Sequence, residues 1–376
     1  MRIGFMRLSM NLELDYSQSS GKILGTELRL GVLEALLQLG HRIVILNELK
    51  PVSQAILKGP KDYWDYSIFS KIKYSPIKIP KNLDLLFIEC SSANVLFGGK
   101  TLARVKEVLC NYSGKVVYYQ HSDALCSLPL GAMYDGEGTN FEPTENISYK
   151  NYFKGMNFKD KKWILLTHAI PELISNRIPN NRYRYSLFDK RIPLKLGYSS
   201  NFDRPKSYSP IRERPFRLIY IGHEKSSVRL KRMKELYGED KCRKVLFGNW
   251  ENVPDNYTFG GFIAPQGNIY KRSYYSKLSK ASIVIGDSFH TDTGMIPSRL
   301  MQSIRSECLT LIDGNFINAS ETMLDDQWVV NNHQEVHDWV RSGHKKIEEA
   351  IMSQQRIIKP WKKLLEPAME EIENVR

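Results

Sequence analysis

The sequence predicts an α/β protein made of two doubly wound, parallel sheets. Short β-branched or apolar runs alternate with amphipathic stretches along almost the whole chain, a pattern typical of parallel strands joined by helices. At 376 residues, the chain is longer than one core usually holds, which indicates two domains of roughly 150 to 200 residues each. A segment rich in serine, proline and charge separates two such series at 197–215.

The first series supplies strands and two helices. Helical spacing runs from Thr26 to Leu39 and stops at Gly40, which we expect to cap the helix, and a second helix is expected at 101–110. The expected strands are 2–5, 42–46, 85–89, 115–119, 163–167 and 193–196.

The second series repeats this alternation. Residues 345–375 are expected to be largely helical, with a break at Pro360. Two doubly wound lobes that face each other would place the carboxyl ends of their strands, and therefore a ligand, in the cleft between them. The expected strands are 217–221, 244–247, 282–285, 309–312 and 328–330, and the expected helices are 226–236, 269–278 and 298–304.

Charge is the unusual feature of the composition. The chain has 54 Lys and Arg against 41 Asp and Glu, a net charge of +13. This excess favours a polyanionic partner or an anionic substrate, and nucleic acid, phosphorylated ligands and acidic membranes all remain open.

Cysteine usage and hydropathy predict a cytoplasmic protein. The five cysteines are odd in number, widely spread and contain no CxxC pair, which is typical of a reducing compartment. The first residues lack the apolar core of a secretory signal. The longest apolar runs fall far short of the roughly 20 residues that span a bilayer, so a membrane-spanning protein is excluded.

The strand at 115–119 runs into a titratable pair, His121 and Asp123. Open α/β sheets expose their sites at such strand ends, where Asp123 could take a proton from an attacking hydroxyl and His121 could orient it or act as the base instead. The alternative is that Asp123 only caps a following helix. A small polar and glycine loop at 90–100 is either a binding loop or an ordinary turn.

Two motifs in the second series suit a diphosphate and a ribose. Gly222 and His223 follow a strand, and Lys225 and Arg229 are spaced by four residues at a helix start, which makes a good diphosphate cradle. The alternative for the two cations is a solvated helix face. Further on, Arg299 and Gln302 lie one helical turn apart and could hold ribose hydroxyls or phosphate oxygens.

Other motifs are absent or unpromising. Neither GxGxxG nor a P-loop occurs, and His333 with His337 lacks the HExxH order, so we expect a solvated helix face there rather than zinc. Basic and aromatic residues interleave at 58–81, 149–163 and 182–191, a composition that suits phosphate contact and base stacking. The alternative, a solvated loop around aromatic core anchors, fits any one of these segments but fits three of them less well.

The stretches SSANVLFGGK at 91–100 and KVVYYQHSD at 115–123 resemble the DNA β-glucosyltransferase family of T-even phages. The match continues in order through the glycine turn with two cations, LFGN at 246–249, VIGD at 284–287, PSRLMQS at 297–303 and LTLID at 309–313. The resemblance implies a GT-B fold: two Rossmann-like domains facing a central cleft, with a C-terminal helix that crosses back to the first domain. The implied divisions are an acceptor, DNA-binding domain at 1–197 completed by 358–376, a linker at 198–215 and a nucleotide-sugar domain at 216–357.

The resemblance also assigns roles to residues. Asp123 matches the general base, Lys225 and Arg229 match the pyrophosphate-binding cations, and Arg299 matches an arginine that contacts the donor. The remaining donor-binding candidates are Gly222, His223, Gly248, Asn249, Gln302 and Glu27. The DNA-binding candidates are Ser92, Asn94, Phe97, Gly98, Lys100, Lys71, Lys73 and Lys154.

The expected reaction is sugar transfer from a UDP-sugar to a hydroxymethylated pyrimidine flipped out of double-stranded DNA. A monomer is expected, with inversion at the anomeric carbon and a loosely held Mg²⁺ or Mn²⁺ but no protein metal site. Tyr-Gln-His at 119–121 is more similar to the related phage α-glucosyltransferase, which leaves the stereochemistry open. The alternatives are a GT-B enzyme acting on a small molecule or a surface polysaccharide, and a catalytically inactive DNA-binding protein.

Overall fold

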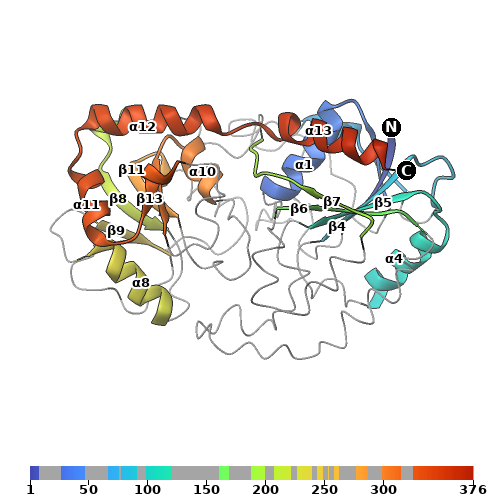
Figure 1. Ribbon diagram of the computed structural model, residues 1–376, viewed down its shortest axis with the longest axis horizontal. Coiled ribbons are helices and arrows are strands. Elements are labelled where there is room, and N and C mark those ends of the chain that lie inside the picture. Colours follow the sequence, from blue (N-terminus) through green and yellow to red (C-terminus); the bar gives the residue numbers. More distant parts are fainter. Residues whose placement is uncertain are drawn as a thin grey trace.

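The protein has two lobes, each built on its own parallel sheet, which lie side by side in a computed structural model (Figure 1). Helices α12 (His344–Ile357) and α13 (Trp361–Asn374) run along one side and connect the lobes. The residues that the structure describes are 1–7, 27–46, 67–75, 78–90, 99–120, 161–168, 188–199, 207–221, 227–238, 244–248, 253, 258–261, 277–286, 299–314 and 325–375.

The first lobe contains a seven-stranded sheet in the order β3-β2-β1-β4-β5-β6-β7. Every neighbouring pair is parallel, so the carboxyl ends of all the strands lie at one edge. The strands are β1 (Arg2–Arg7), β2 (Arg42–Ile45), β3 (Lys73–Tyr74), β4 (Leu85–Cys90), β5 (Lys115–Gln120), β6 (Trp163–Thr167) and β7 (Lys190–Pro193).

Apolar side chains are buried on both faces of this sheet. Ile3 and Phe5 pack with residues of α1 (Glu27–Gln38) and α13, whereas Met6 packs with residues of α4 (Gly99–Cys110) on the opposite face. Strands covered on both faces need continuous apolar runs, which is why these segments stand out in the sequence. Helix α1 ends as predicted at Gly40, whose φ of 84° allows the backbone N–H groups of Gly40 and His41 to bond back to the last turn.

The second lobe contains a six-stranded sheet in the order β10-β9-β8-β11-β12-β13, again entirely parallel. Helix α8 (Ser227–Tyr237) packs against α11 (His333–Arg341), and α10 (Arg299–Arg305) packs with α12 against β12. The strands are β8 (Phe216–Ile221), β9 (Lys244–Phe247), β10 (Thr258–Gly261), β11 (Ala281–Gly286), β12 (Leu309–Asp313) and β13 (Val329–Val330).

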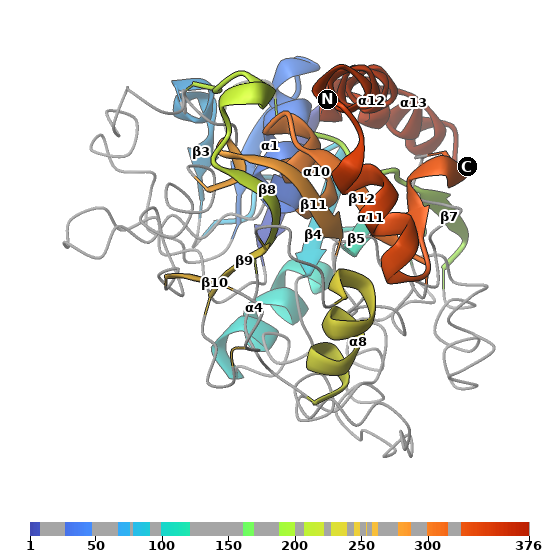
Figure 2. The same ribbon diagram turned by 90° about the vertical axis from the view of Figure 1, so that its left-hand side faces the viewer.

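Two segments cross between the lobes next to each other. Tyr198 pairs with Pro360, and the backbone N–H of Trp361 donates to the Tyr198 carbonyl at 3.0 Å. The Trp361 ring is fully buried against Gly31 of α1, where a Cβ atom would overlap the ring. Beyond this point α13 packs along α1, and Figure 2 shows α12 and α13 following one another along the same side of the molecule.

The structure corrects several sequence-based boundaries. The strand predicted at 193–196 runs instead from Lys190 to Pro193, because Pro193 has no backbone N–H to donate and ends an edge strand. Strands β3 and β10 were not predicted; both lie at sheet edges, and β3 has only two residues. The break at Pro360 is confirmed, since α12 ends at Ile357 and Pro360 caps α13. The predicted helix at 269–278 lies mostly outside the described residues.

The solvated helix face predicted around His333 and His337 is wrong in part. His337 is buried and the two rings stack, with centroids 5.9 Å apart. His333 also covers Gly238, where a Cβ would overlap its ring. The pair therefore packs α11 against the end of α8.

No helix within the described ranges is both long enough and apolar enough to cross a membrane.

Candidate functional site

Each sheet reverses its strand order at one point, and such switch points form ligand-binding crevices at the carboxyl ends of strands. In the first sheet the reversal lies between β1 and β4, and in the second between β8 and β11. A predicted site residue therefore belongs to such a crevice if it follows the carboxyl end of a strand at or beside a switch point.

The candidate diphosphate cradle follows β8, at the switch point of the second sheet. Strand β8 ends at Ile221 and α8 begins at Ser227, so Arg229 is the third residue of that helix. Gly222, His223 and Lys225 fall in the connection between them, outside the described residues. A strand followed by the N-terminus of a helix is the order that a cradle of helix amides requires.

Three other donor candidates follow the two strands that neighbour β8 in this sheet. Arg299 is the first residue of α10, which comes after β11, the second strand of the switch point, and Gln302 is half-buried one turn further on. Gly248 directly follows β9 with a φ of 131°, which favours glycine at this strand end. Asn249 lies outside the described residues. The topology thus brings the predicted donor motifs to one edge of the sheet.

A buried ion pair that the sequence did not reveal fastens α8 at the same edge. Arg232 lies one turn after Arg229, and its Nη2 atom is 2.6 Å from Oδ1 of Asp313, the last residue of β12. Its Nε atom donates to both carboxylate oxygens, at 3.1 and 3.2 Å. The Asp313 side chain is only 1% exposed, so this fork-shaped pair is shielded from water and fixes the orientation of α8.

The catalytic candidates follow the central strands of the first sheet. Strand β5 ends at Gln120, directly before His121 and Asp123, and strand β4 ends at Cys90 beside it. Glu27 is the first residue of α1 and Lys100 the second residue of α4. His121, Asp123, Ser92, Asn94, Phe97, Gly98 and Lys154 lie outside the described residues.

A buried hydrogen-bonded chain holds the end of β5. The Tyr119 hydroxyl lies 2.8 Å from Nε2 of His168, whose Nδ1 lies 2.6 Å from the Leu194 carbonyl oxygen. Because a carbonyl only accepts hydrogen bonds, Nδ1 carries the proton and Nε2 accepts from Tyr119. The His168 ring also packs edge-on against Trp361, at 5.3 Å between centroids. The partners of His168 come from three other segments of the chain, so the spacing of residues in the sequence does not reveal this hydrogen-bonded chain.

Glu89 is a further candidate, a buried carboxylate that was not predicted from the sequence. It lies at the carboxyl end of β4, in register with Arg7 on one side and Tyr119 on the other, and is 0% exposed. Acidic residues are almost never fully buried without a structural or chemical reason. The signal that could have found it is a glutamate ending the apolar run LLFI.

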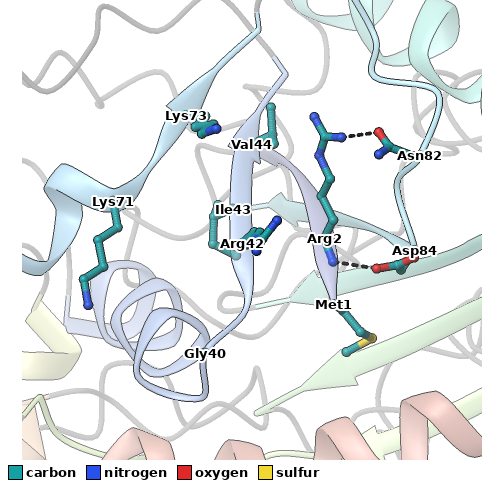
Figure 3. Close-up of a pocket in the computed structure, with 10 residues that line it drawn as sticks. All are labelled: Met1, Arg2, Gly40, Arg42, Ile43, Val44, Lys71, Lys73, Asn82 and Asp84. Carbon is teal, nitrogen blue, oxygen red and sulfur yellow. Dashed lines mark hydrogen bonds between the residues drawn. The ribbon is translucent and has the colours of Figure 1, made fainter.

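Lys71 and Lys73 lie elsewhere. They line a pocket at the amino ends of β1 to β4, the edge opposite to the one that the catalytic candidates follow (Figure 3). The structure therefore places these two DNA-binding candidates away from the strand ends that the catalytic candidates follow.

Neither possible metal ligands nor the buried cysteine forms a further site in the described part of the chain. It holds no cluster of three His, Cys, Asp or Glu side chains that could bind a metal ion. Cys308 is buried, its Sγ lies 2.9 Å from the Leu278 carbonyl oxygen, and burial raises its thiol pKa to about 12. Such a thiol is inert as a nucleophile.

Comparisons with known proteins establish the fold. No protein-family model and no curated protein matches the sequence. Among solved structures, an α-glucosyltransferase in complex with UDP-glucose and DNA containing an abasic site aligns over 100% of both chains, with a TM-score of 0.60 and 10% identity. Anabaena HepE in complex with UDP-glucose aligns over 99% of this chain and 100% of its own, with a TM-score of 0.55 and 9% identity.

T4 phage BGT in complex with UDP and Mn²⁺ aligns over 99% of this chain and 97% of its own, with a TM-score of 0.52 and 16% identity. Together with the two parallel sheets and their flanking helices, these likenesses show that the chain has the predicted GT-B fold.

Proposed function

We propose that this protein is a glycosyltransferase that moves a sugar from a UDP-sugar to the hydroxyl of a hydroxymethylated pyrimidine in double-stranded DNA. The observation that carries the proposal is the placement of the motifs on a GT-B fold: the donor motifs follow the strands at the switch point of the second sheet, and Asp123 follows a central strand of the first. Two aligned structures support the donor, because each holds UDP-glucose, and one of these also holds DNA.

In the proposed reaction, Asp123 removes the proton from the acceptor hydroxyl. The acceptor oxygen bonds to the anomeric carbon while the bond from that carbon to the diphosphate breaks, and UDP leaves with the electron pair. In-line attack of this kind inverts the anomeric carbon. The target base must leave the helix stack, since its hydroxyl cannot reach a site at a sheet edge while it is paired.

Lys225, Arg229 and the first amides of α8 stabilise the negative charge on the departing diphosphate. The Arg232–Asp313 pair keeps α8 in position for this role. A Mg²⁺ or Mn²⁺ ion would neutralise part of the same charge, and one aligned structure holds UDP with Mn²⁺. In the part of the chain that the structure describes, no group of three His, Cys, Asp or Glu side chains could hold such an ion.

A direct test incubates the protein with duplexes containing hydroxymethylcytosine or hydroxymethyluracil and a panel of UDP-sugars, and identifies the nucleosides by mass spectrometry. We expect one base to gain one sugar. Asp123→Asn should lower the transfer rate by roughly 10²- to 10⁴-fold and leave UDP binding unchanged, because it removes only the base. Asp338→Asn, an exposed aspartate on α11, is the matched control. A fully active Asp123→Asn enzyme would refute the assignment of the base.

A second candidate is a GT-B enzyme that glycosylates a small molecule or a polysaccharide. It is favoured by the alignment with Anabaena HepE, whose structure is a complex with UDP-glucose. Such an enzyme would bind the same donor but should not bind duplex DNA, so a salt-dependent gel shift separates the two.

A further inference from the structure

A second charged site lies at the amino edge of the first sheet, away from the strand ends that the catalytic candidates follow. It is a pocket with a volume of about 670 Å³, formed where β1, β2, β3 and β4 begin (Figure 3). Among the described residues, its wall includes four cations, Arg2, Arg42, Lys71 and Lys73, and one carboxylate, Asp84. A pocket with this excess of positive charge is suited to an anionic ligand.

Strand register places three of these cations on one face of the sheet. Arg2 is directly opposite Arg42, and Lys73 is opposite Val44, which lies two residues after Arg42 on β2. In-register residues of parallel strands, and residues two apart on one strand, project from the same face. Arg2 and Arg42 are therefore like charges on neighbouring strands about 4.8 Å apart, and an anion bound between them would reduce their mutual repulsion.

The described neighbours offset only part of this charge. Asp84 accepts a hydrogen bond at 2.6 Å from the backbone N–H of Arg2, and the Arg2 guanidinium donates to the neutral amide oxygen of Asn82. In the described ranges, no salt bridge involves Arg42, Lys71 or Lys73. Their charges remain available to a ligand.

The cations are also accessible. Arg42, Lys71 and Lys73 are exposed, and Gly40 forms the wall where α1 ends. Gly40 has no side chain, and no atom lies within 4 Å of the point where its Cβ would stand, so this side of the pocket is open. The carbonyls of the last turn of α1 are already bonded by the Gly40 and His41 N–H groups, which limits their repulsion of an anion.

We propose that this pocket binds a phosphate group and that its ligand is the backbone of duplex DNA, held away from the reacting base. The identification of duplex DNA as the ligand rests on the proposed function, whereas the presence of a phosphate site does not. Guanidinium groups pair with two phosphate oxygens at once, and lysines add point charge. Because the pocket lies at the edge opposite to the strand ends that the catalytic candidates follow, it contributes affinity and orientation without contacting the sugar donor.

The test compares the full-length protein with the triple variant Arg42→Gln, Lys71→Gln and Lys73→Gln. Binding of an unmodified duplex is measured by fluorescence anisotropy at several salt concentrations. Each lost phosphate contact reduces the slope of log affinity against log salt by about 0.9, so the slope should fall by about 2 to 3 and the affinity by roughly 10- to 100-fold at 0.1 M salt.

Two control variants accompany it. The triple Lys345→Gln, Arg356→Gln and Lys362→Gln removes the same charge from exposed positions on α12 and α13, and it should change the slope by less than about 1. The triple Arg42→Lys, Lys71→Arg and Lys73→Arg keeps the charge and should keep duplex binding. Thermal melting of all three variants confirms that they fold.

A second arm titrates inorganic phosphate into the wild type and the pocket triple by calorimetry. Loss of both duplex and phosphate binding in the pocket triple supports the proposal. If the pocket triple loses only phosphate binding, the duplex is not the ligand and the site belongs to a free phosphorylated molecule. If the pocket triple binds duplex and phosphate as the α12 and α13 control does, the site itself is overturned. Sugar transfer is assayed separately, so failure of the proposed function is distinguishable from failure of this site.

Discussion

Replacing Arg232 with leucine should loosen α8 by an amount that the geometry allows us to work out. The change leaves the Asp313 carboxylate, 1% exposed and bonded by three contacts of 2.6 to 3.2 Å, without its cation. Breaking a buried pair by removing one partner costs about 3 to 5 kcal/mol, whereas the second contact of Arg232, to the exposed Glu235, contributes about 0.3 to 0.5 kcal/mol. The expected loss therefore comes almost entirely from Asp313.

Hydrogen exchange followed by mass spectrometry measures this loss locally. Since about 1.4 kcal/mol is a factor of ten, the loss of about 3 to 5 kcal/mol should make amides of α8 and β12 exchange roughly 10²- to 10⁴-fold faster in Arg232→Leu. Peptides of α4, in the other lobe, should be unchanged and serve as the internal control. The double variant Arg232→Leu with Asp313→Leu should recover most of the protection, because an apolar pair replaces a buried ionic one.

Two results would refute this reasoning. Exchange in α8 that rises by less than about tenfold in the single variant would mean that the pair is not shielded from water as the structure indicates. A double variant as labile as the single would mean that the loss comes from leucine packing rather than from the uncompensated Asp313 charge.

Three more predictions follow from buried contacts. Trp361→Ala should destabilise the first lobe by about 3 to 5 kcal/mol, since it empties the buried site against α1; calorimetric melting measures this, and an unchanged melting temperature would contradict it. Burial raises the pKa of the Cys308 thiol to about 12, so a thiol reagent at pH 8 should label exposed Cys110 and leave Cys308 unlabelled. Equal labelling rates in peptide mass spectra would be inconsistent with this burial. Arg305→Gln removes a 2.7 Å hydrogen bond to the Ser199 carbonyl and a cation–π contact at 4.2 Å, so exchange at 197–199 should accelerate by roughly tenfold, and an unchanged rate would count against it.

The central strands could be predicted from the sequence because burial on both faces demands continuous apolar residues. Strand β6 matched its predicted bounds, and β8 and β12 were each one residue longer than expected. Edge strands could not be predicted in the same way. Strand β3 is a Lys-Tyr pair whose strand character comes only from its pairing with β2, and Pro193 ends β7 where the apolar pattern suggested a beginning.

The candidate site was predictable where it depends on chain order and unpredictable where it depends on distant pairs. The strand before Arg229 and the helix that contains it could be recognised because an apolar run, a glycine and helical spacing follow one another in the sequence. Arg232 and Asp313 lie 81 residues apart, and Tyr119 and His168 lie 49 apart, so only the folded chain brings them together. The four pocket cations are likewise far apart in the sequence, and only Lys71 and Lys73 were predicted as binding residues, because aromatic residues surround them in the sequence.

The packing of α13 against α1 also sets the order in which the molecule can be completed during synthesis. Lys115, at the start of β5, donates to the carbonyls of Ile372 and Glu373, and Trp361 fills the space above Gly31. A ribosome must therefore translate the entire second lobe before it delivers the helix that covers the first. Until then the apolar face of α1 stays uncovered, and the lobe that begins the chain is the last to reach its final form.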